Sequence, residues 1–598
     1  MRTPKENALM KKLFPLLILS LLLAACQPTS APQPPTAEPP PETPTPASTL
    51  PSKDVFQTAV AAGEATQAAG PTAEPTNTPK PAPTIEPNRN YWWNDVVFYE
   101  IFVRSFYDSD GDGIGDLNGL IEKLDYLNDG DPSTTNDLGI TGIWLMPIME
   151  SPSYHGYDVT DYYKVDPDYG TNEDFKRLME EAHKRGIYVI VDLVLNHTST
   201  QHPWFVESKD PNSPYRDWYL WSDTYQDYTG PWGQKVWHSM NGAYYYGVFW
   251  DGMPDLNLQN PVVTRQIENV TRFWLDQMGV DGFRFDAIKH FIEDGSAQEN
   301  TVYTHDWLVD YNTFYKSVNP DAFSVGEAWT STNETLDYTG DEMDVVFAFD
   351  LAETFLDAAA GTDAQSAATL TAQMVDTFPP NQYATFLANH DQNRTMSQLV
   401  GNVDFAKMAA TIQLTSPGVP FIYYGEEIGM TGVKPDEDIR LPMQWNGNTV
   451  KAGFTSGTPW RTPSPDTPTF NVASQNNDPD SLLNHYRDLI HLRNEHPALL
   501  NGDWVQVESN SKYIYAFMRR SADEQILVVI NASRNALNGS NYALTLTNGA
   551  LPTGARAVSL LGEANPAEIT INANGGFDAY VPFSSIPGKG FGIIQLVP

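Results

Sequence analysis

Several short apolar stretches of this sequence end in side chains that are suited to acid and base chemistry. In GVDGFRFDAIKH (279–290), Arg284 and Asp286 lie two residues apart, so on a β-strand their side chains share one face. Taken alone, this stretch fits a buried structural ion pair equally well. Two further strand-like stretches end in the same way, and three carboxylates at strand ends indicate an active site at the C-terminal mouth of a parallel barrel. The other two are SVGEAW (324–329), with Glu327, and ATFLANHDQNR (384–394), with His390 and Asp391.

The elements that must position these residues alternate along the chain. Near-continuous apolar runs of strand length are separated by amphipathic helical patterns such as NEDFKRLMEEAHKR (172–185) and PVVTRQIENVTRFWLDQM (261–278). Apolar strands that alternate with helices imply a parallel sheet covered on both faces, and eight of them imply an α/β fold of the (β/α)8 TIM barrel type. The eight runs are 96–103, 139–148, 186–197, 280–287, 322–329, 343–350, 384–391 and 419–427.

Two regions break this alternation. Residues 198–252 follow the third strand, are rich in Trp, Tyr, Asp and Gly, and lack a helical period, which predicts an inserted subdomain beside the active site. After a helical stretch at 482–500 the pattern changes to period two, which predicts a C-terminal antiparallel β-sandwich domain at 504–598. The catalytic barrel is therefore expected to comprise residues 91–197 and 253–500.

The N-terminal region has the composition of an export signal followed by a tether. Residues 1–26 combine a basic start, a short apolar run and the sequence Leu-Ala-Ala-Cys, which is typical of a bacterial lipoprotein signal peptide with Cys26 as the lipidated residue. A simple secretory signal is the alternative. Residues 27–90 are rich in Pro, Thr, Ala and Glu and predict a disordered tether. We therefore expect a lipid-anchored, exported protein whose catalytic part is extracellular or periplasmic.

The charge of the chain limits its partners. The 36 Lys and Arg residues stand against 75 Asp and Glu residues, a net charge of −39. This charge argues against nucleic acids and anionic membrane surfaces as partners, so membrane contact is expected only through the N-terminal lipid.

With these strand ends identified, the sequence resembles the α-amylase family, the retaining α-glucan hydrolases of glycoside hydrolase family 13. The resemblance covers roughly residues 91–598 and rests on motifs in the order of the family. These motifs are DLVLNH (192–197), an intermediate MPDLN pattern (253–257), GFRFDAIKH (282–290), GEAW (326–329), NHDQNR (389–394) and GVPFIYYGEEIGM (418–430).

The resemblance assigns a role to each carboxylate. Retaining cleavage of a glycosidic bond needs one ionised carboxylate as nucleophile and one protonated carboxylic acid for the leaving oxygen. The resemblance implies that Asp286 is the nucleophile, that Glu327 is the acid/base with a raised pKa, and that Asp391 stabilises the distorted sugar. Arg284 is expected to keep Asp286 ionised. Residues expected to bind the substrate are His155, Tyr157, His197, Arg284, Lys289, His290, Trp329 and His390.

Two calcium sites are expected. The loop DSDGDGIGDLNG (108–119) offers hard oxygen ligands at alternating positions on a Gly-rich turn, and a related loop binds calcium in the oligo-1,6-glucosidase-like branch of the family. A solvated acidic turn is the alternative. The expected ligands are Asp108, Asp110, Asp112, the Ile114 carbonyl and Asp116. The resemblance to α-amylases implies a second site, for which the matching positions are Asn196, Asp255 and the backbone of His290.

The substrate preference has to be inferred from mixed motifs. PMQW (442–445) resembles the oligo-1,6-glucosidase branch, but exo-acting members of that branch carry an aspartate where this chain has Tyr154. Lys289 and His290 follow the pattern of endo-acting amylases. We therefore predict an endo-acting α-amylase that cuts α-1,4 bonds in starch, glycogen and maltodextrins, with some transglycosylation.

Three other functions were weighed. A neopullulanase or cyclomaltodextrinase usually carries an extra N-terminal β domain for dimerisation, whereas only the tether precedes this barrel, so a monomer is expected. An oligo-1,6-glucosidase-like α-glucosidase is the second alternative. A non-catalytic glucan-binding surface lipoprotein is the third, although such proteins typically lose one of the three carboxylates.

Overall fold

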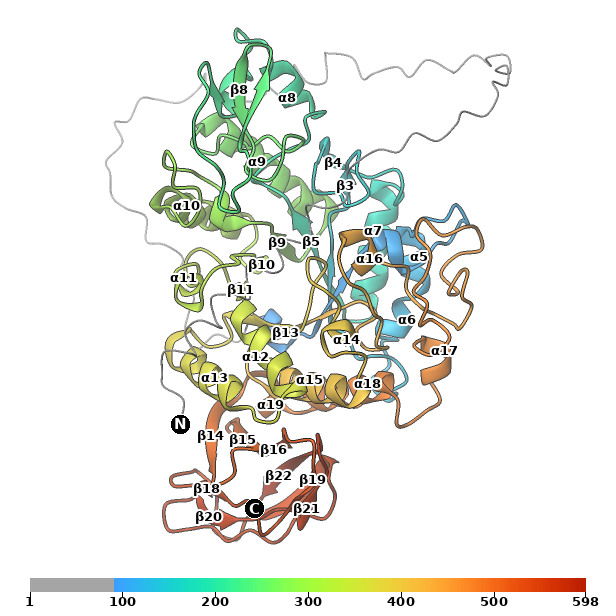
Figure 1. Cartoon of the computed structure of the whole chain (residues 1–598), viewed down its shortest axis with the longest axis vertical. Coiled ribbons are helices and arrows are strands. Elements are labelled where there is room, and N and C mark those ends of the chain that lie inside the picture. The colour runs from blue at the N-terminus through green and yellow to red at the C-terminus, as the bar shows by residue number, and fades with distance from the viewer. Residues whose placement is uncertain (1–90) are drawn as a thin grey trace, which may run out of the picture. The chain divides into compact units, whose positions relative to one another are not determined.

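The computed structural model describes residues 91–598, so the signal peptide, Cys26 and the tether lie outside the described residues. Eight parallel strands close into a barrel in the order β1-β13-β12-β11-β10-β9-β5-β2. Each strand lies within one of the eight apolar runs or begins one residue before it, which confirms the predicted TIM barrel (Figure 1). The strands are β1 (Phe98–Ile101), β2 (Gly142–Leu145), β5 (Tyr188–Leu193), β9 (Gly282–Phe285), β10 (Phe323–Gly326), β11 (Val345–Phe347), β12 (Tyr383–Thr385) and β13 (Val419–Tyr423).

The strands are apolar on both faces because each face packs against a different core. Phe98, Phe323 and Phe421 belong to a cluster that includes residues from most of the barrel strands, and the ring of Phe98 stacks on both other rings at 5.3 and 4.5 Å. The neighbouring residues Tyr99 and Ile101 instead join the larger cluster that also contains the helices. The alternation of side chains along a strand explains this division.

Helices separate the strands in sequence (Figure 1). The predicted helices at 172–185 and 261–278 are observed, the second continuing from an α-helix into a π-helical turn. The predicted helix at 482–500 is broken before Pro497, which begins a new helix because proline lacks the N–H that would continue the first. The longer helices are α7 (Asn172–Lys184), α9 (Pro261–Arg272), α10 (Val302–Val318), α12 (Phe349–Ala360), α13 (Gln365–Thr377), α15 (Val403–Thr415) and α18 (Leu482–Glu495), and the helix that begins at Pro497 is the short α19 (Pro497–Asn501).

Shorter elements fill the connections. Residues 117–129, whose apolar side chains have a helical period, form two short helices on either side of Lys123. They and the other short helices are η1 (Trp92–Asp95), α4 (Val103–Phe106), α5 (Leu117–Glu122), α6 (Leu124–Leu127), α8 (Pro203–Ser208), η2 (Arg216–Trp218), η3 (Phe273–Met278), η4 (Ile288–His290), α11 (Thr332–Leu336), α14 (Thr395–Gln398), α16 (Asp436–Ile439) and α17 (Val472–Gln475).

The long connection after β5 has its own small sheet. Strands β6 (Trp221–Ser222), β7 (Trp237–Met240) and β8 (Ala243–Tyr246) pair in the order β6-β8-β7. The sequence lacks a helical period in this region, but one short helix, α8, forms here. Its first turn contains Pro203, and the His202 side chain accepts a hydrogen bond from the Trp204 backbone N–H. A hairpin of β3 (Met149–Glu150) and β4 (Asp161–Val165) follows β2.

The C-terminal residues form an antiparallel domain, as predicted. The first part of β14 pairs with β15, and its end pairs with β18, so that one strand links two groups of strands. A buried cluster contains residues from both groups. The strands are β14 (Asp503–Ser509), β15 (Ile514–Arg520), β16 (Gln525–Asn531), β17 (Leu537–Asn538), β18 (Leu544–Leu546), β19 (Arg556–Gly562), β20 (Phe577–Tyr580), β21 (Ser585–Ile586) and β22 (Phe591–Val597).

Two buried arginines meet at the end of α15, Arg493 from α18 of the barrel part and Arg519 from the C-terminal domain. Arg493 donates to the carbonyl oxygens of Leu414 and Ser416, and Arg519 of β15 donates to that of Thr415. The last carbonyl groups of a helix lack partners within the helix and carry partial negative charge. The two guanidinium groups therefore satisfy the helix end, and that of Arg519 holds the C-terminal domain against it.

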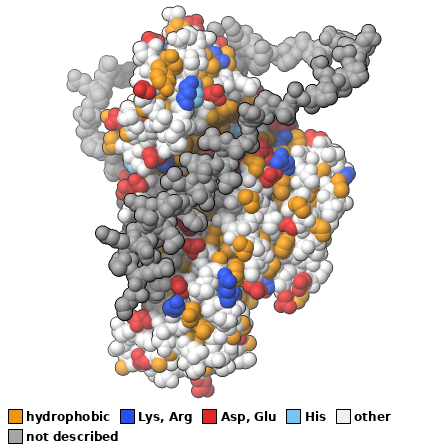
Figure 2. Space-filling view, viewed as in Figure 1, with side chains coloured by type: hydrophobic (Ala, Val, Ile, Leu, Met, Phe, Trp, Pro, Cys, Tyr) orange, Lys and Arg blue, Asp and Glu red, His pale blue; other side chains and the backbone are white. Residues whose placement is uncertain are grey.

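The acidic side chains do not form one dominant patch on the face of the molecule that is drawn in Figure 2. In Figure 2, acidic and basic side chains are scattered among hydrophobic and other side chains. Within residues 91–598, no helix is long and apolar enough to cross a membrane.

Candidate active site

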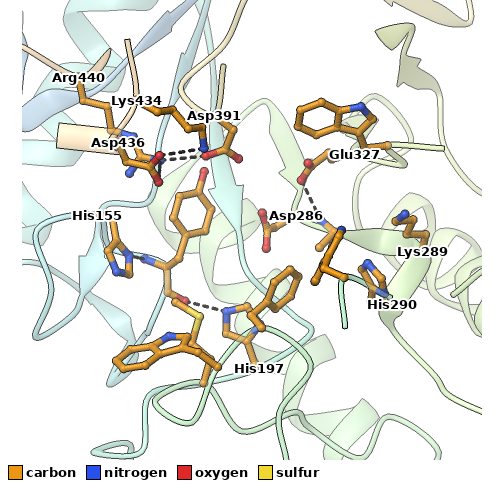
Figure 3. Close-up of a pocket in the computed structure, with 17 residues that line it drawn as sticks. His155, His197, Asp286, Lys289, His290, Glu327, Asp391, Lys434, Asp436 and Arg440 are labelled. Atoms are coloured by element: carbon orange, nitrogen blue, oxygen red, sulfur yellow. Dashed lines mark hydrogen bonds and ion pairs between the residues drawn. The ribbon is translucent and has the colours of Figure 1, made fainter. Parts of the chain in front are cut away.

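The three predicted carboxylates meet in a cleft at the C-terminal ends of the barrel strands (Figure 3). The cleft has a volume of about 760 Å³. Asp286 follows β9, Glu327 follows β10 and Asp391 lies beyond β12, so the strand ends bring together residues up to 105 positions apart in sequence. The lining residues are His155, Tyr157, His197, Trp232, Phe249, Trp250, Met253, Asp286, Ala287, Lys289, His290, Glu327, Trp329, Asp391, Lys434, Asp436 and Arg440.

The Arg284 guanidinium group lies behind the carboxylates and connects them. Its Nη1 is 2.8 Å from Asp286 Oδ1 and 2.8 Å from Asp192 Oδ2, and its Nη2 is 2.5 Å from Glu327 Oε2. Arg284 is 1% exposed and does not line the cleft. Its place is therefore behind the two carboxylates that it orients, whereas the sequence had placed it among the residues that touch the substrate.

Glu327 has the electrostatics of a carboxyl group that keeps its proton. Burial, together with the negative charges of Asp286 and Asp391, raises the pKa of Glu327 to about 7 in spite of the opposing charge of Arg284. Its Oε2 also accepts a hydrogen bond from the Ala287 backbone N–H at 3.1 Å. Ala287 has φ +47°, a left-handed conformation that is costly for alanine and aims this N–H at Glu327.

Asp391 has the opposite electrostatics. Its Oδ1 accepts a hydrogen bond from Arg440 Nη2 at 2.9 Å, and its Oδ2 lies 3.3 Å from His390 Nε2. Burial acts to raise its pKa, but the positive charges of His390, Arg440 and Arg284 outweigh burial and lower it to about 2. The cleft therefore holds one carboxyl group poised near neutral pH and another that stays ionised.

One wall of the cleft contains Tyr157 and two histidines. The Tyr157 hydroxyl lies 3.1 Å from Asp192 Oδ2, to which it donates, and 2.5 Å from His390 Nε2. His197 Nε2 is 3.2 Å from the Tyr157 carbonyl oxygen, and His155 Nδ1 accepts from the Tyr157 backbone N–H at 3.1 Å. Tyr157, His155 and His197 line the cleft, whereas His390 is fully buried behind it.

The opposite wall offers an aromatic face and a basic group. The ring of Trp329 is 46% exposed and stacks on Phe349 at 4.5 Å, with an interplanar angle of 8°. Lys289 forms an ion pair with Glu299 at 2.8 Å, and His290 Nδ1 is 2.8 Å from the Gln298 carbonyl oxygen. Trp329, Lys289 and His290 all line the cleft, where the sequence placed them.

The acidic loop brings three of its carboxylates together. Oxygen atoms of Asp108, Asp110 and Asp116 lie within 4.8 Å of one another, whereas Asp112 is outside this group. The Asp112 carboxylate accepts the Ile114 backbone N–H at 2.7 Å, and burial raises its pKa, as do the charges of Asp110 and Asp108. Carboxylate oxygens at this spacing fit the ligand set of a calcium ion.

A second group of oxygens lies under the insertion, and the sequence identified only part of it. Asn196 Oδ1, Asp255 Oδ2 and Glu293 Oε1 are buried and have no hydrogen-bond partner. Burial, followed by the charge of Glu293, raises the pKa of Asp255, and burial raises that of Glu293 to about 7. Buried oxygens without donors fit a cation. Glu293 carries no motif in the sequence, and only the fold shows that it belongs here.

Several lining residues were also missed because they come from outside the recognised strand ends. Trp232, Phe249, Trp250 and Met253 belong to the insertion and its exit, and Lys434, Asp436 and Arg440 belong to the loop after β13. The aromatic richness of 198–252 was a signal, but it did not separate Trp232, which is 60% exposed, from the buried Trp218 and Trp237. The position of Arg440 just before PMQW was the only sequence signal for the loop.

Several known proteins have sequences similar to this chain. Residues 100–502 match the family described as "Alpha amylase, catalytic domain". Alpha-amylase 3 of Dictyoglomus thermophilum is 41% identical over 459 residues, which cover 75% of this chain and 87% of that protein. An oligo-1,6-glucosidase of Parageobacillus thermoglucosidasius is 34% identical over 521 residues, which cover 74% of this chain and 90% of that protein.

Solved structures extend the comparison to the fold. The α-amylase from H. orenii has a TM-score of 0.73 and 40% identity, and the match covers 84% of this chain and 99% of that one. An isomaltulose synthase from Erwinia rhapontici has a TM-score of 0.71 and 31% identity, covering 85% and 100% of the two chains. The similar proteins thus carry names of several different activities on α-glucosides.

Proposed function

The chain belongs to the α-amylase family of glycoside hydrolases, and from this premise we propose that it is a retaining endo-hydrolase of α-1,4-glucosidic bonds in starch, glycogen and maltodextrins. The observation that carries the proposal is the pair of carboxyl groups bound to one guanidinium group, Asp286 and Glu327. Retention requires two carboxyl groups only about 5 Å apart, and a shared Arg284 favours this short spacing.

The proposed mechanism gives each carboxylate one task. Asp286, which Arg284 orients, attacks the anomeric carbon and forms a covalent glycosyl-enzyme. Glu327 gives its proton to the leaving oxygen and, once ionised, takes a proton from the water that releases the sugar. Asp391, with a pKa near 2, provides a fixed negative charge beside the cationic transition state. A second sugar in place of water would give transglycosylation.

The form of the cleft supports internal attack on a chain. Aromatic side chains of the insertion line it on one side, and the loop with Lys434, Asp436 and Arg440 lines it on another. Tyr154, at the position where exo-acting relatives carry an aspartate, stacks on Trp460 at 5.6 Å and does not line the cleft. This arrangement offers no acidic side chain at position 154 to hold the free end of a chain.

The α-glucosidase alternative rests on similarity to proteins named oligo-1,6-glucosidase. Product lengths from amylose at the first per cent of conversion distinguish the two. A spread of intermediate maltooligosaccharides with rapid loss of iodine staining is expected. Glucose or maltose alone, with persistent staining, would instead support exo-attack.

The substitution Asp286→Asn distinguishes an enzyme from a protein that only binds glucan. If Asp286 is the nucleophile, the variant should lose at least about 10³-fold in kcat on amylose, because the covalent step has no other nucleophile. Binding of amylose to the variant should persist, which separates lost chemistry from lost folding. Unchanged hydrolysis would disprove the assignment of Asp286.

We further propose that calcium occupies both oxygen clusters. Asp108, Asp110 and Asp116 would hold one ion in the acidic loop, and Asn196, Asp255 and Glu293 would hold the other. The ions would supply positive charge that neutralises carboxylates packed at these positions. The second ion would fasten the insertion to the barrel beside the cleft, because Asn196 follows β5 and Asp255 follows the insertion.

A further inference from the structure

His390 lies at the centre of a hydrogen-bond chain that leads away from the cleft into the barrel. Its Nε2 lies 2.5 Å from the Tyr157 hydroxyl and 3.3 Å from Asp391 Oδ2, and its Nδ1 lies 2.5 Å from Glu100 Oε1. His390 is 0% exposed and Glu100 is 2% exposed. Water therefore does not replace the contact between His390 and Glu100, and this contact fixes the orientation of the ring.

Glu100 occupies an unusual place for a carboxylate. It lies on β1, two residues after Phe98, so its side chain points into the barrel above the aromatic core. Its register partners are Trp144 of β2 and Tyr423 of β13. The ring of Trp144 packs edge-on against His390 at 5.6 Å. Neither Glu100 nor His390 lines the cleft, so Glu100 acts on the cleft only through His390 and the lining residues Tyr157 and Asp391.

The partners of His390 determine where its protons are. The Tyr157 hydroxyl has one proton, which it donates to Asp192, and its oxygen also lies 3.4 Å from the donor Arg284 Nη1. Its oxygen is therefore an acceptor for His390 Nε2–H, and Asp391 is an acceptor as well. Since Nδ1 faces the Glu100 carboxylate, both ring nitrogens carry a proton and the ring is an imidazolium.

The charges that face the His390 ring are consistent with the imidazolium form. Burial lowers the pKa of His390, and Arg440 also acts to lower it, but the charges of Asp391 and Glu100 together with the Glu100 hydrogen bond outweigh both and raise the pKa. His390 in turn lowers the pKa of Asp391. The charge on Glu100 is thus coupled to Asp391 through a single buried ring.

We propose that Glu100 is a positioning residue of the active site, which accepts the Nδ1 proton of His390 and so keeps the ring charged, with its Nε2–H directed at Asp391 and Tyr157. The inference rests on the proposed catalytic role of Asp391. Nothing in the sequence motifs marks Glu100, because it lies 290 residues from its partner.

Glu100→Gln removes the charge but almost none of the volume. Without the Glu100 charge the imidazolium is less stable, so a larger fraction of the rings carries only one proton. If the ring keeps Nδ1–H, a bare Nε2 faces the Asp391 carboxylate and repels it. If it keeps Nε2–H, the ring no longer carries the charge that supports Asp391. In both cases stabilisation of the transition state falls, and the loss should appear in kcat more than in KM.

The test is a double-mutant cycle in the full-length protein, with an α-glucoside that the wild-type enzyme hydrolyses. Glu100→Gln should lower kcat/KM at least about tenfold, and combining it with His390→Asn should cost little more than His390→Asn alone, because both act through the same ring. Glu100→Asp should restore part of the loss. Glu427→Gln is the matched control, since Glu427 is equally buried but accepts hydrogen bonds from Tyr99 and Tyr126 and not from His390.

Thermal unfolding of each variant separates effects on folding from effects on catalysis. Wild-type kcat/KM for Glu100→Gln, or effects of the two substitutions that multiply, would overturn the inference. If Glu100→Gln does not fold, Glu100→Leu, which also removes the carboxylate, would overturn it if kcat/KM and the melting temperature were those of the wild type. Because the cycle uses any α-glucoside that is cleaved, failure of the endo-α-1,4 proposal would be seen separately in the wild-type products.

Discussion

At the scale of single residues, the chemistry depends on giving different proton affinities to carboxyl groups in one cleft. Burial raises the pKa of Glu327 to about 7, whereas the positive charges of His390 and Arg440 lower that of Asp391 to about 2 despite its burial. Pairs of groups whose pKa values are moved apart are typical of acid and base assignments in enzymes. Glu327 is thus the group whose proton is available near neutral pH.

The pH dependence of the reaction follows from Glu327. Its raised pKa means that the carboxyl group is protonated below about pH 7 and ionised above it. Since protonation of the leaving oxygen needs the acid form, kcat/KM should fall about tenfold per pH unit above that value. A pH profile on a maltooligosaccharide measures this limb, and a profile that stays flat to pH 9 would contradict the role of Glu327.

The insertion is the element that decides how the cleft holds a long chain. Trp232 is 60% exposed, and its ring packs on Phe249 at 5.7 Å inside the cleft. Trp232→Ala should raise KM for long maltooligosaccharides about two- to tenfold, because an aromatic contact contributes about 0.5–1.5 kcal/mol. The kcat value should change little.

Tyr225→Ala provides the control for Trp232, because Tyr225 is 51% exposed on the same insertion but does not line the cleft. Kinetics with short and long chains make the comparison. Equal effects of the two substitutions would show that Trp232 acts through the fold of the insertion and not through the sugar.

The acidic loop is the second element with a prediction of its own. Asp110 is exposed, and within its loop its Oδ1 accepts the Asp112 backbone N–H. Asp110→Asn should therefore leave the loop folded but weaken calcium binding, because a neutral amide replaces a charged ligand. Calorimetric titration should show one fewer calcium ion per chain than in the wild type, and calcium should raise the melting temperature less.

Asp131→Asn is the matched control for the loop, since Asp131 accepts the Ser133 backbone N–H in a comparable exposed turn. Calcium binding by this variant should equal that of the wild type. If chelation leaves the wild-type melting temperature unchanged, or if Asp110→Asn binds calcium as tightly as the wild type, the loop is a solvated acidic turn.

At the scale of the whole molecule, we propose that the barrel and its C-terminal domain are tethered to a membrane by lipid. The basis is the Leu-Ala-Ala-Cys sequence and the Pro- and Thr-rich stretch after it, both outside the described residues. Lipid on Cys26 would be the anchor. Cys26→Ser expressed in a bacterial host should move the activity from the membrane fraction to the soluble fraction. Membrane activity that persists in this variant would contradict the anchor.

The sequence alone determined the barrel, the three carboxylates and their order, because strand and helix periods and short motifs are properties of neighbouring residues. It did not determine which side chains from distant segments would meet. Glu100 reaches His390, Glu293 joins Asn196 and Asp255, and Trp232 faces the cleft while Trp237 enters the core. These outcomes depend on how strands, insertion and loops pack against one another, and only the tertiary structure decides that packing.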